Sequence, residues 1–191
     1  MNKICWLDLE TTGLDPVKNG IIQAAFIIEI DGEVKEKREF NMNPIGKVLD
    51  PQAMAIHGLS EADLGGFPTS LQVKKDIERF FSEFVEKFDK TDKFTVAGYN
   101  VDFDLGFLEN LWLESGDKFF FSWVKHFPID VFKVHPFMEW AGIATAPERR
   151  NLETLAKHYG IEFPNAHNAL ADIEMTRELA LKLREKVRVA Q

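Results

Sequence analysis

The sequence predicts an α/β protein with one mixed sheet, in which an antiparallel meander of three strands is followed by parallel strands, with helices on both faces. Two observations support this fold class. Three strand-like segments follow one another near the N-terminus, and strand-like and helix-like segments alternate through the rest of the chain. The 191 residues, 45% of them hydrophobic and 28% charged, suit one domain with a full core.

The meander is predicted from three consecutive segments. Residues 3–9, "KICWLDL", are apolar on both faces and rich in β-forming residues, which is typical of a buried strand. Residues 20–30, "GIIQAAFIIEI", predict the second strand, and "DGE" at 31–33 is a hairpin turn signal. Residues 34–42 alternate in character and predict the returning strand, so the sheet begins antiparallel.

The rest of the chain carries four helical patterns and one further strand. The strand is "FTVAGYN", residues 94–100, and we expect it in the centre of the sheet. Helices are predicted over 69–88, 102–114, 151–159 and 168–188. The apolar positions that predict the first two helices are Leu71, Ile77, Phe80, Phe81, Phe84 and Phe88, then Phe103, Phe107 and Leu111.

Composition limits the function classes. The net charge of −8 argues against a broad basic surface for nucleic acid, but it allows a local site where metal ions supply the positive charge. No apolar run reaches the roughly 18 residues that span a bilayer, so no membrane partner is expected. The chain opens without a signal-peptide pattern, and its single cysteine, Cys5, fits a core position. We therefore expect a cytoplasmic protein.

Two acids stand at the end of the first predicted strand. Asp8 and Glu10 project to the same face, about 6.6 Å apart, because side chains alternate along a strand. They follow a core-like run and precede a sharp turn, and paired carboxylates there suit a divalent cation, which prefers oxygen ligands. The alternative is a solvated strand end, which an isolated acid pair would favour.

Two later segments carry acids that can join this pair. In "YNVDFDLGFL", Asp102 fits a helix N-cap, and Asp104 lies in the first helical turn on the inward side. An inward carboxylate is costly without a partner, and a salt bridge and a metal both remain open for Asp104. In "NAHNALADIEMTREL", Asn168 fits an N-cap and places Asp172 in the first turn, where the helix N-terminus also favours an acid.

His167 stands five residues before Asp172. Five helical residues rotate by about 140°, so the two side chains diverge if both lie on the helix. They converge if His167 lies in the loop before the cap. The alternative for His167 alone is a surface histidine at a helix start.

Taken in order, "DLETTG", "YNVDFDLGFL" and "HNALAD" resemble the three exonuclease motifs of the DEDDh branch of DnaQ-like 3′→5′ exonucleases. This is the superfamily of the proofreading subunit of bacterial DNA polymerase III. The resemblance covers nearly the whole chain and includes "MAIHGLSEADL" at 54–64 and "RRNLETLAKHYGI" at 149–161. It implies a ribonuclease H-like fold and a single exonuclease domain over 1–191. Tyr99 departs from the family pattern, which often has histidine there.

The resemblance implies that Asp8, Glu10, Asp104 and Asp172 bind metal and that His167 is the general base. Four carboxylates in one pocket repel each other, and two Mg²⁺ or Mn²⁺ ions roughly 3.5–4 Å apart would neutralise them. Such ions stabilise the attacking water and the leaving oxygen of a phosphodiester. A histidine with a reference pKa of about 6.5 suits removal of the proton from that water.

Recognition of a 3′ end is also implied by the resemblance. The turn that begins at Thr11 would face the terminal nucleotide, with Leu14 packed on the base and Thr12 close to the 3′-OH. Phe103 and His57 are further candidates for lining the nucleotide pocket, although Phe103 also fits the core and His57 also fits a turn cap. Contacts of this kind are largely tolerant of sequence.

Other phosphate contacts can come from four basic residues, for which a solvated surface charge is the alternative: Lys74, Lys75, Arg149 and Arg150. Three functions compete: a metal-dependent 3′→5′ exonuclease on single-stranded DNA or RNA, an exoribonuclease that trims RNA or degrades short oligonucleotides, and an inactive nucleic-acid-binding or polymerase-partner module. The third is disfavoured because all five expected functional residues are present. The sequence identifies no residue that reads the 2′-OH, and it leaves a homodimer and a polymerase partner open.

Overall fold

The predicted α/β architecture is confirmed by a computed structural model that describes residues 2–162 and 168–190. Within these ranges five strands form one sheet in the order β3-β2-β1-β4-β5. The first three strands pair antiparallel, and β4 and β5 are parallel to β1. The strands are β1 (Lys3–Thr11), β2 (Ile21–Ile30), β3 (Glu33–Asn41), β4 (Thr95–Gly98) and β5 (Ile129–Asp130).

The β2–β3 hairpin forms where the sequence predicted it. Ile30 pairs with Glu33, and the two residues between them, Asp31 and Gly32, have φ angles of 52° and 90°. Positive φ at both central positions is what a two-residue type I′ turn requires, and Asp-Gly is a favoured pair for it. The predicted meander is therefore confirmed, although β1 continues two residues past its predicted end, to Thr11.

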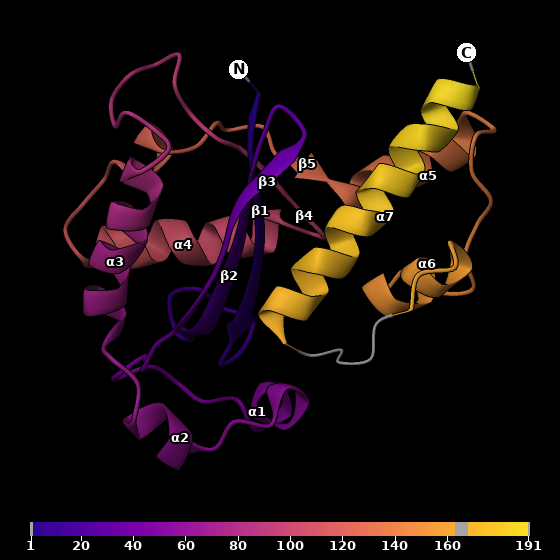
Figure 1. Ribbon diagram of the computed structural model, residues 1–191. Coiled ribbons are helices and arrows are strands. Elements are labelled where there is room, and N and C mark those ends of the chain that lie inside the picture. The colour runs from indigo at the N-terminus through magenta and orange to yellow at the C-terminus, as the bar shows by residue number, and fades with distance from the viewer. Residues whose placement is uncertain (1, 163–167, 191) are drawn as a thin grey trace.

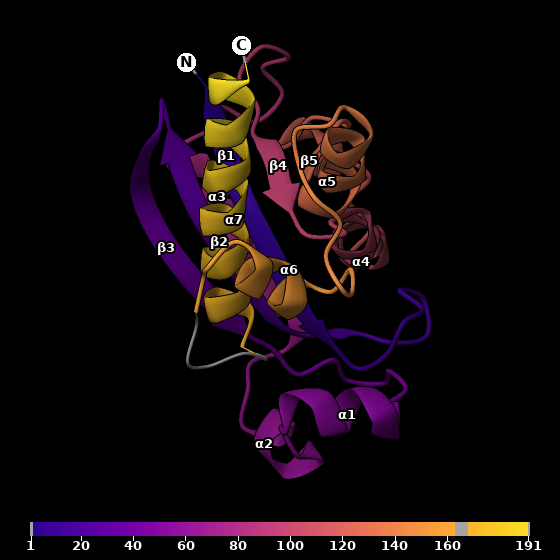
Figure 2. The same cartoon turned by 90° about the vertical axis from the view of Figure 1, so that its right-hand side faces the viewer.

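Helices cover both faces of the sheet (Figures 1 and 2). The helices α3 and α4 lie against one face, and α7 crosses the other face with α5 and α6 beside it. The short helices α1 and α2 lie together at one end of the molecule. The helices are α1 (Pro51–His57), α2 (Glu61–Gly65), α3 (Ser70–Ser82), α4 (Asp102–Glu114), α5 (Val131–Trp140), α6 (Leu152–His158) and α7 (Ala169–Val189), with a 3₁₀ turn, η1 (Phe120–Ser122).

Alternation along β1 divides its side chains between two cores. Cys5, Leu7 and Leu9 belong to the large core beneath α3 and α4, whereas Ile4 and Trp6 pack with the start of α7. The large core is rich in aromatic rings, and Phe26 of β2 contacts Phe40, Phe80 and Phe81. Because side chains alternate, the two acids at the end of β1 lie on the α7 side of the sheet.

Two predictions about helix ends are wrong. The predicted helix 69–88 ends at Ser82, and Phe88 lies beyond it with a positive φ of 76° and an exposed ring. Leu71, at the start of α3, is also exposed. Asp102 is not the N-cap of α4, because that position is Val101 and the Asp102 carboxylate instead pairs with Lys133.

A helix that crosses a membrane must be long and predominantly apolar. In the ranges 2–162 and 168–190, none of the helices combines the length and apolar character that a membrane crossing needs.

The aromatic core yields a stability prediction. Phe26→Ala removes a fully buried ring that three other rings surround, and we expect it to lower the free energy of unfolding by about 3–5 kcal/mol. The matched control is Phe127→Ala, because the Phe127 ring is 86% exposed and its loss should change stability by less than about 0.5 kcal/mol. Urea unfolding of both variants measures the difference. Similar losses in the two variants would contradict the assignment of Phe26 to the core.

Candidate active site

Three carboxylates from distant parts of the chain meet at one end of the sheet. Asp8 and Glu10 come from the end of β1, and Asp172 comes from the first turn of α7. One carboxylate oxygen from each lies within 4.8 Å of the others. All three side chains are half-buried, so the cluster stands at the rim of the core and remains open to a ligand.

The start of α7 is fixed to the sheet by a side chain that the sequence reading missed. The Gln23 carboxamide oxygen accepts hydrogen bonds from the Ala169 N–H at 2.9 Å and from the Asn168 side chain at 3.4 Å. Asn168 is the N-cap, as predicted, and its backbone carbonyl accepts the Asp172 N–H at 3.0 Å. Gln23 pairs with Glu10 across β1 and β2, so one residue links both sources of acid. Its signal in the sequence was a single amide in a strand whose one other polar residue is Glu29.

Asp104 lies beside this group of three. It is buried in the first turn of α4, on the inward side as predicted, and its Oδ1 accepts the Leu9 N–H at 3.1 Å. Leu9 stands between the two acids of β1, so this bond joins the start of α4 to the strand end. Among the residues that the structure describes, Asp104 forms no ion pair. A metal-binding role for Asp104 stays a prediction.

The electrostatics of the cluster are unfavourable when it is fully ionised. The pKa of Asp8 lies well above its usual range, first because burial removes the carboxylate from water and then because Asp104, Asp172 and Glu10 carry like charges nearby. Burial likewise raises the pKa of Asp104, and the charges of Asp130 and Glu10 add to this, against the lowering effect of the Leu9 hydrogen bond.

A divalent cation would relieve this repulsion. It would replace the missing water as a partner for carboxylate oxygens, which are the ligands that hard cations prefer. Converging carboxylates whose ionisation is disfavoured in the cation-free fold are therefore a donor set that fits such an ion.

The whole pattern matches a known family. The family model RNase_T, described as Exonuclease, matches residues 5–180. The chain belongs to this exonuclease family. The exonuclease class and the DnaQ-like resemblance inferred from the three motifs are thereby confirmed.

Individual relatives of this chain share 24% to 31% of its residues. DNA polymerase III PolC-type of Lacticaseibacillus paracasei is 28% identical over 181 residues, and that of Latilactobacillus sakei is 31% identical over 192 residues. Each match covers 94% of this chain but 11% of the relative, so the chain spans about a tenth of these proteins. A zinc-bound complex of E. coli ExoI with single-stranded DNA has a TM-score of 0.79 at 24% identity, covering 97% of this chain and 41% of ExoI.

The turn after β1 in the exonuclease domain is held by its own hydrogen bonds. Thr12 is fully buried, and its hydroxyl donates to the Val48 carbonyl at 2.7 Å and accepts the Gly20 N–H at 2.9 Å. The Thr11 hydroxyl donates to the Gly13 carbonyl at 2.8 Å. Leu14, in contrast, is 82% exposed. Leu14 therefore has a side chain available for a nucleotide, whereas the hydroxyl of Thr12 is already used within the turn.

The other predicted contact residues lie in different surroundings. His57, half-buried at the end of α1, accepts the Leu59 N–H through Nδ1 at 3.1 Å, which is the turn-capping arrangement considered above. The half-buried ring of Phe103 packs against Phe107 at the border of the large core. His167 lies outside the described residues. A substrate contact by His57 or Phe103 and a catalytic role for His167 remain predictions.

The four basic candidates differ from one another. Lys74 was expected at the surface, but it is buried and pairs with Glu78 at 2.9 Å and Asp117 at 3.1 Å, so it stabilises the fold. Arg150 forms a two-pronged pair with Glu139, both bonds at 2.8 Å. Lys75 and Arg149 are exposed and can reach a phosphate without breaking such a pair.

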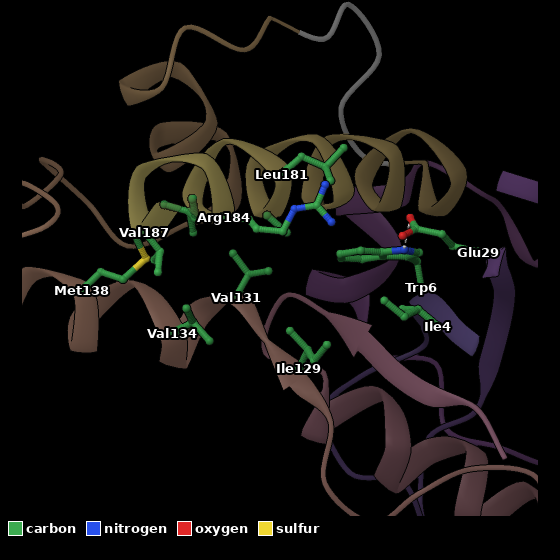
Figure 3. Close-up of a pocket in the computed structure, with 12 residues that line it drawn as sticks. Ile4, Trp6, Glu29, Ile129, Val131, Val134, Met138, Leu181, Arg184 and Val187 are labelled. Atoms are coloured by element: carbon green, nitrogen blue, oxygen red, sulfur yellow. Dashed lines mark hydrogen bonds between the residues drawn. The ribbon is translucent and has the colours of Figure 1, made fainter. Parts of the chain in front are cut away.

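A separate apolar cavity of about 250 Å³ lies between the sheet, α5 and α7 (Figure 3). Trp6 forms part of its wall, and the Trp6 indole N–H donates to Glu29, which also accepts from Arg177 at 2.7 Å. Trp6 and Glu29 thus already have hydrogen-bond partners at this wall. The acid cluster belongs to Asp8, Glu10 and Asp172, so the chemistry is expected there and not in this cavity.

The raised pKa of Asp8 yields a pH prediction for the metal-free protein. Because the folded-state pKa lies above the unfolded value of about 3.9, ionisation of Asp8 costs stability as pH rises. Asp8→Asn should therefore be more stable than wild type at pH 7, and this advantage should shrink as pH falls towards 4. Thermal melts between pH 4 and 8 in EDTA measure it.

The control for this experiment is a carboxylate whose pKa is lowered, not raised, in the folded state. Hydrogen bonds from Ser60 lower the pKa of the exposed Asp63 carboxylate, so its ionisation stabilises the fold. Asp63→Asn should therefore be less stable than wild type at pH 7, and this deficit should stay nearly constant above about pH 4 and shrink below it. If the advantage of Asp8→Asn were the same at pH 4 and pH 7, repulsion at the acid cluster would not be its cause.

Proposed function

We propose that this chain is a metal-dependent 3′→5′ exonuclease that removes nucleoside monophosphates from the 3′ ends of single-stranded nucleic acid. The observation that carries the proposal is the convergence of Asp8, Glu10 and Asp172, with Asp104 hydrogen-bonded to the strand between the first two. Membership of the exonuclease family supports it. The zinc and single-stranded DNA of the ExoI complex support the ion and the substrate.

DNA is the substrate that the relatives favour. Two of them are DNA polymerases of the PolC type, and the third binds single-stranded DNA. An RNA substrate would need a residue that recognises the 2′-OH, and the side chains described at the site identify none. Action beside a DNA polymerase is the partner relationship that the PolC relatives support.

The acids hold the cations in this proposal. Asp8, Glu10 and Asp172 would bind them, and Asp104 would add its charge from the start of α4. Mg²⁺ or Mn²⁺, when bound, supplies positive charge that stabilises the attacking and leaving oxygens of the phosphodiester. The chain's own part is to hold the carboxylates at fixed positions. The β1–β2 ladder fixes two of them, and Gln23 fixes the start of the helix that carries the third.

The remaining steps are assigned to other side chains of the chain. His167 accepts a proton from the attacking water at a ring nitrogen, and it must be neutral to do so. Leu14 offers an exposed apolar surface to the terminal base, and Thr11 lies at the start of the same turn. His57 and Phe103 line the path of the neighbouring nucleotide. Contacts of this kind bind an end without reading a sequence.

The polarity of the reaction can be tested with blocked substrates. If the turn from Thr11 to Leu14 reads a free 3′-OH, an oligonucleotide that ends in a 3′-phosphate should be degraded at least about tenfold more slowly. Single-stranded DNA labelled at the 5′ end measures both rates and shows the order in which products appear. The control is a circular single strand, which should remain intact. Cleavage of the circle would identify an endonuclease.

Two variants separate the metal ligands from the base. Asp8→Ala should abolish activity and weaken Mn²⁺ binding, because it removes a carboxylate from the centre of the cluster. His167→Ala should slow cleavage by roughly 10²–10⁴-fold while Mn²⁺ binds almost normally, which is the usual contribution of a general base. Calorimetric Mn²⁺ titration and single-turnover cleavage measure both effects. Wild-type Mn²⁺ affinity in Asp8→Ala would contradict the assignment of Asp8 as a ligand.

A further inference from the structure

We propose that Asn19 is a positioning residue that fixes the turn from Thr11 to Leu14 against the acid cluster and thereby sets how the terminal nucleotide is held. The inference rests on the proposed function, because it concerns the wall that would meet the 3′ end. The hydrogen bonds of the Asn19 side chain go to backbone groups of Thr12, Asp15 and Val48. Asn19 acts through the backbone of the turn, which begins one residue after Glu10.

The Asn19 carboxamide forms hydrogen bonds through both its oxygen and its nitrogen. The side chain is 7% exposed, and its Nδ2 donates to the Thr12 carbonyl at 3.2 Å and to the Val48 carbonyl at 2.9 Å. Its Oδ1 accepts the Asp15 N–H at 3.0 Å. A buried amide with three hydrogen bonds of this kind fixes the segments that it joins, because its removal would take one hydrogen bond from each of the three backbone groups.

These bonds join three segments around the proposed substrate path. The Thr12 carbonyl also accepts the Asp50 N–H at 2.8 Å, and Asp50 is the N-cap of α1, the helix that ends in His57. Asn19 therefore connects the end of β1 with the segment that leads into α1. Both segments carry residues expected at the nucleotide, Leu14 on the first and His57 on the second.

Gly13 fits against Asn19 closely enough to specify both residues. A Cβ at position 13 would lie 2.5 Å from Cγ and 2.5 Å from Nδ2 of Asn19, closer than non-bonded atoms approach. The turn can pass over the carboxamide because position 13 is glycine. Any larger residue there has to move either the turn or Asn19, so the two positions form one interlocked unit.

The acids have a support that is independent of this unit. Asp8 and Glu10 are held by the β1–β2 ladder, whose register shifts between Glu10 and Thr11, and the start of α7 is held by Gln23. Loss of Asn19 should therefore displace the turn and leave the acid cluster in place. The expected consequence is a defect in holding the 3′ end, with metal binding preserved.

The test uses Asn19→Ala and Asn19→Asp in the full chain. Asn19→Asp keeps the size of the side chain but cannot donate to the two carbonyls. Both variants should lose about 10- to 10²-fold in kcat/KM on single-stranded DNA, mainly through KM, and should discriminate less between 3′-OH and 3′-phosphate ends. Calorimetry should find a Mn²⁺ affinity within about twofold of wild type, since the β1–β2 ladder and Gln23 support the acids.

Two controls separate positioning from general destabilisation. Ile77→Val, a fully buried position in α3, lowers thermal stability without touching the turn and should keep both KM and end discrimination. Gly13→Ala should reproduce the Asn19 defect with a different atom change. The double variant Gly13→Ala/Asn19→Ala should be less impaired than the product of the two single effects, because removal of the carboxamide makes room for the new Cβ.

The outcomes distinguish this inference from the proposed function. A wild-type protein that ignores the chemistry of the 3′ end would overturn the proposed function and the Asn19 inference with it. An active, end-selective wild type together with folded Asn19 variants of unchanged KM and selectivity would overturn only the Asn19 inference. Equal losses of Mn²⁺ affinity and activity would overturn it too, because the residue would then support the acid cluster itself. If Asn19→Ala failed to fold, Gly13→Ala would give the same comparison.

Discussion

Repulsion between carboxylates in one half-buried pocket is the constraint on which this structure depends. Burial and, in addition, the like charges of neighbouring acids disfavour the ionisation of Asp8 and Asp104, so the pocket costs stability when these two are charged and no cation is bound. The rest of the fold has to hold the acids together against this force. The aromatic core on the other face of the sheet and the long docked helix α7 supply that support. A cluster that the apolar core did not stabilise would simply move apart.

The alternation of side chains along β1 allows one strand to serve both purposes. One face gives Cys5, Leu7 and Leu9 to the large core, and the other gives Asp8 and Glu10 to the site. The strand lies inside the sheet: β2 pairs with it along its length through both acids, and β4 pairs with it from Ile4 to Trp6. Rigid backbone under the acids matters because ligand geometry tolerates only small displacements.

Much of the fold was predictable because its signals are local. The Asp-Gly hairpin, the helix over 102–114 and the Asn168 cap each follow from neighbouring residues, and the structure has all three. The helix end at Ser82 was missed because the apolar spacing continues through Phe84, which packs against the core from beyond the helix. Spacing alone cannot show that the backbone has already left the helix.

The site was predictable only as a set of acids. Their order along the chain suggested one pocket, and the structure brings three of them together. Gln23, which fixes the start of α7 beside the acids, and Asn19, which holds the turn, were missed because a buried amide has no local pattern, and its value comes from backbone groups that folding brings close. Lys74 was misjudged for the same reason, since its two acidic partners make a buried lysine affordable.

Different hydrogen bonds hold the acid cluster and the turn that would meet the terminal nucleotide. Ladder hydrogen bonds and Gln23 hold the acids, whereas side-chain bonds between loops hold the turn that carries Leu14. Loop positions accept changes in length and sequence far more readily than paired strands do. Changes within the turn or at its Val48 contact can therefore alter which ends are bound while the acid cluster stays intact. Under the proposed function, one acid cluster on this fold can in this way be directed to different nucleic-acid ends by loop changes alone.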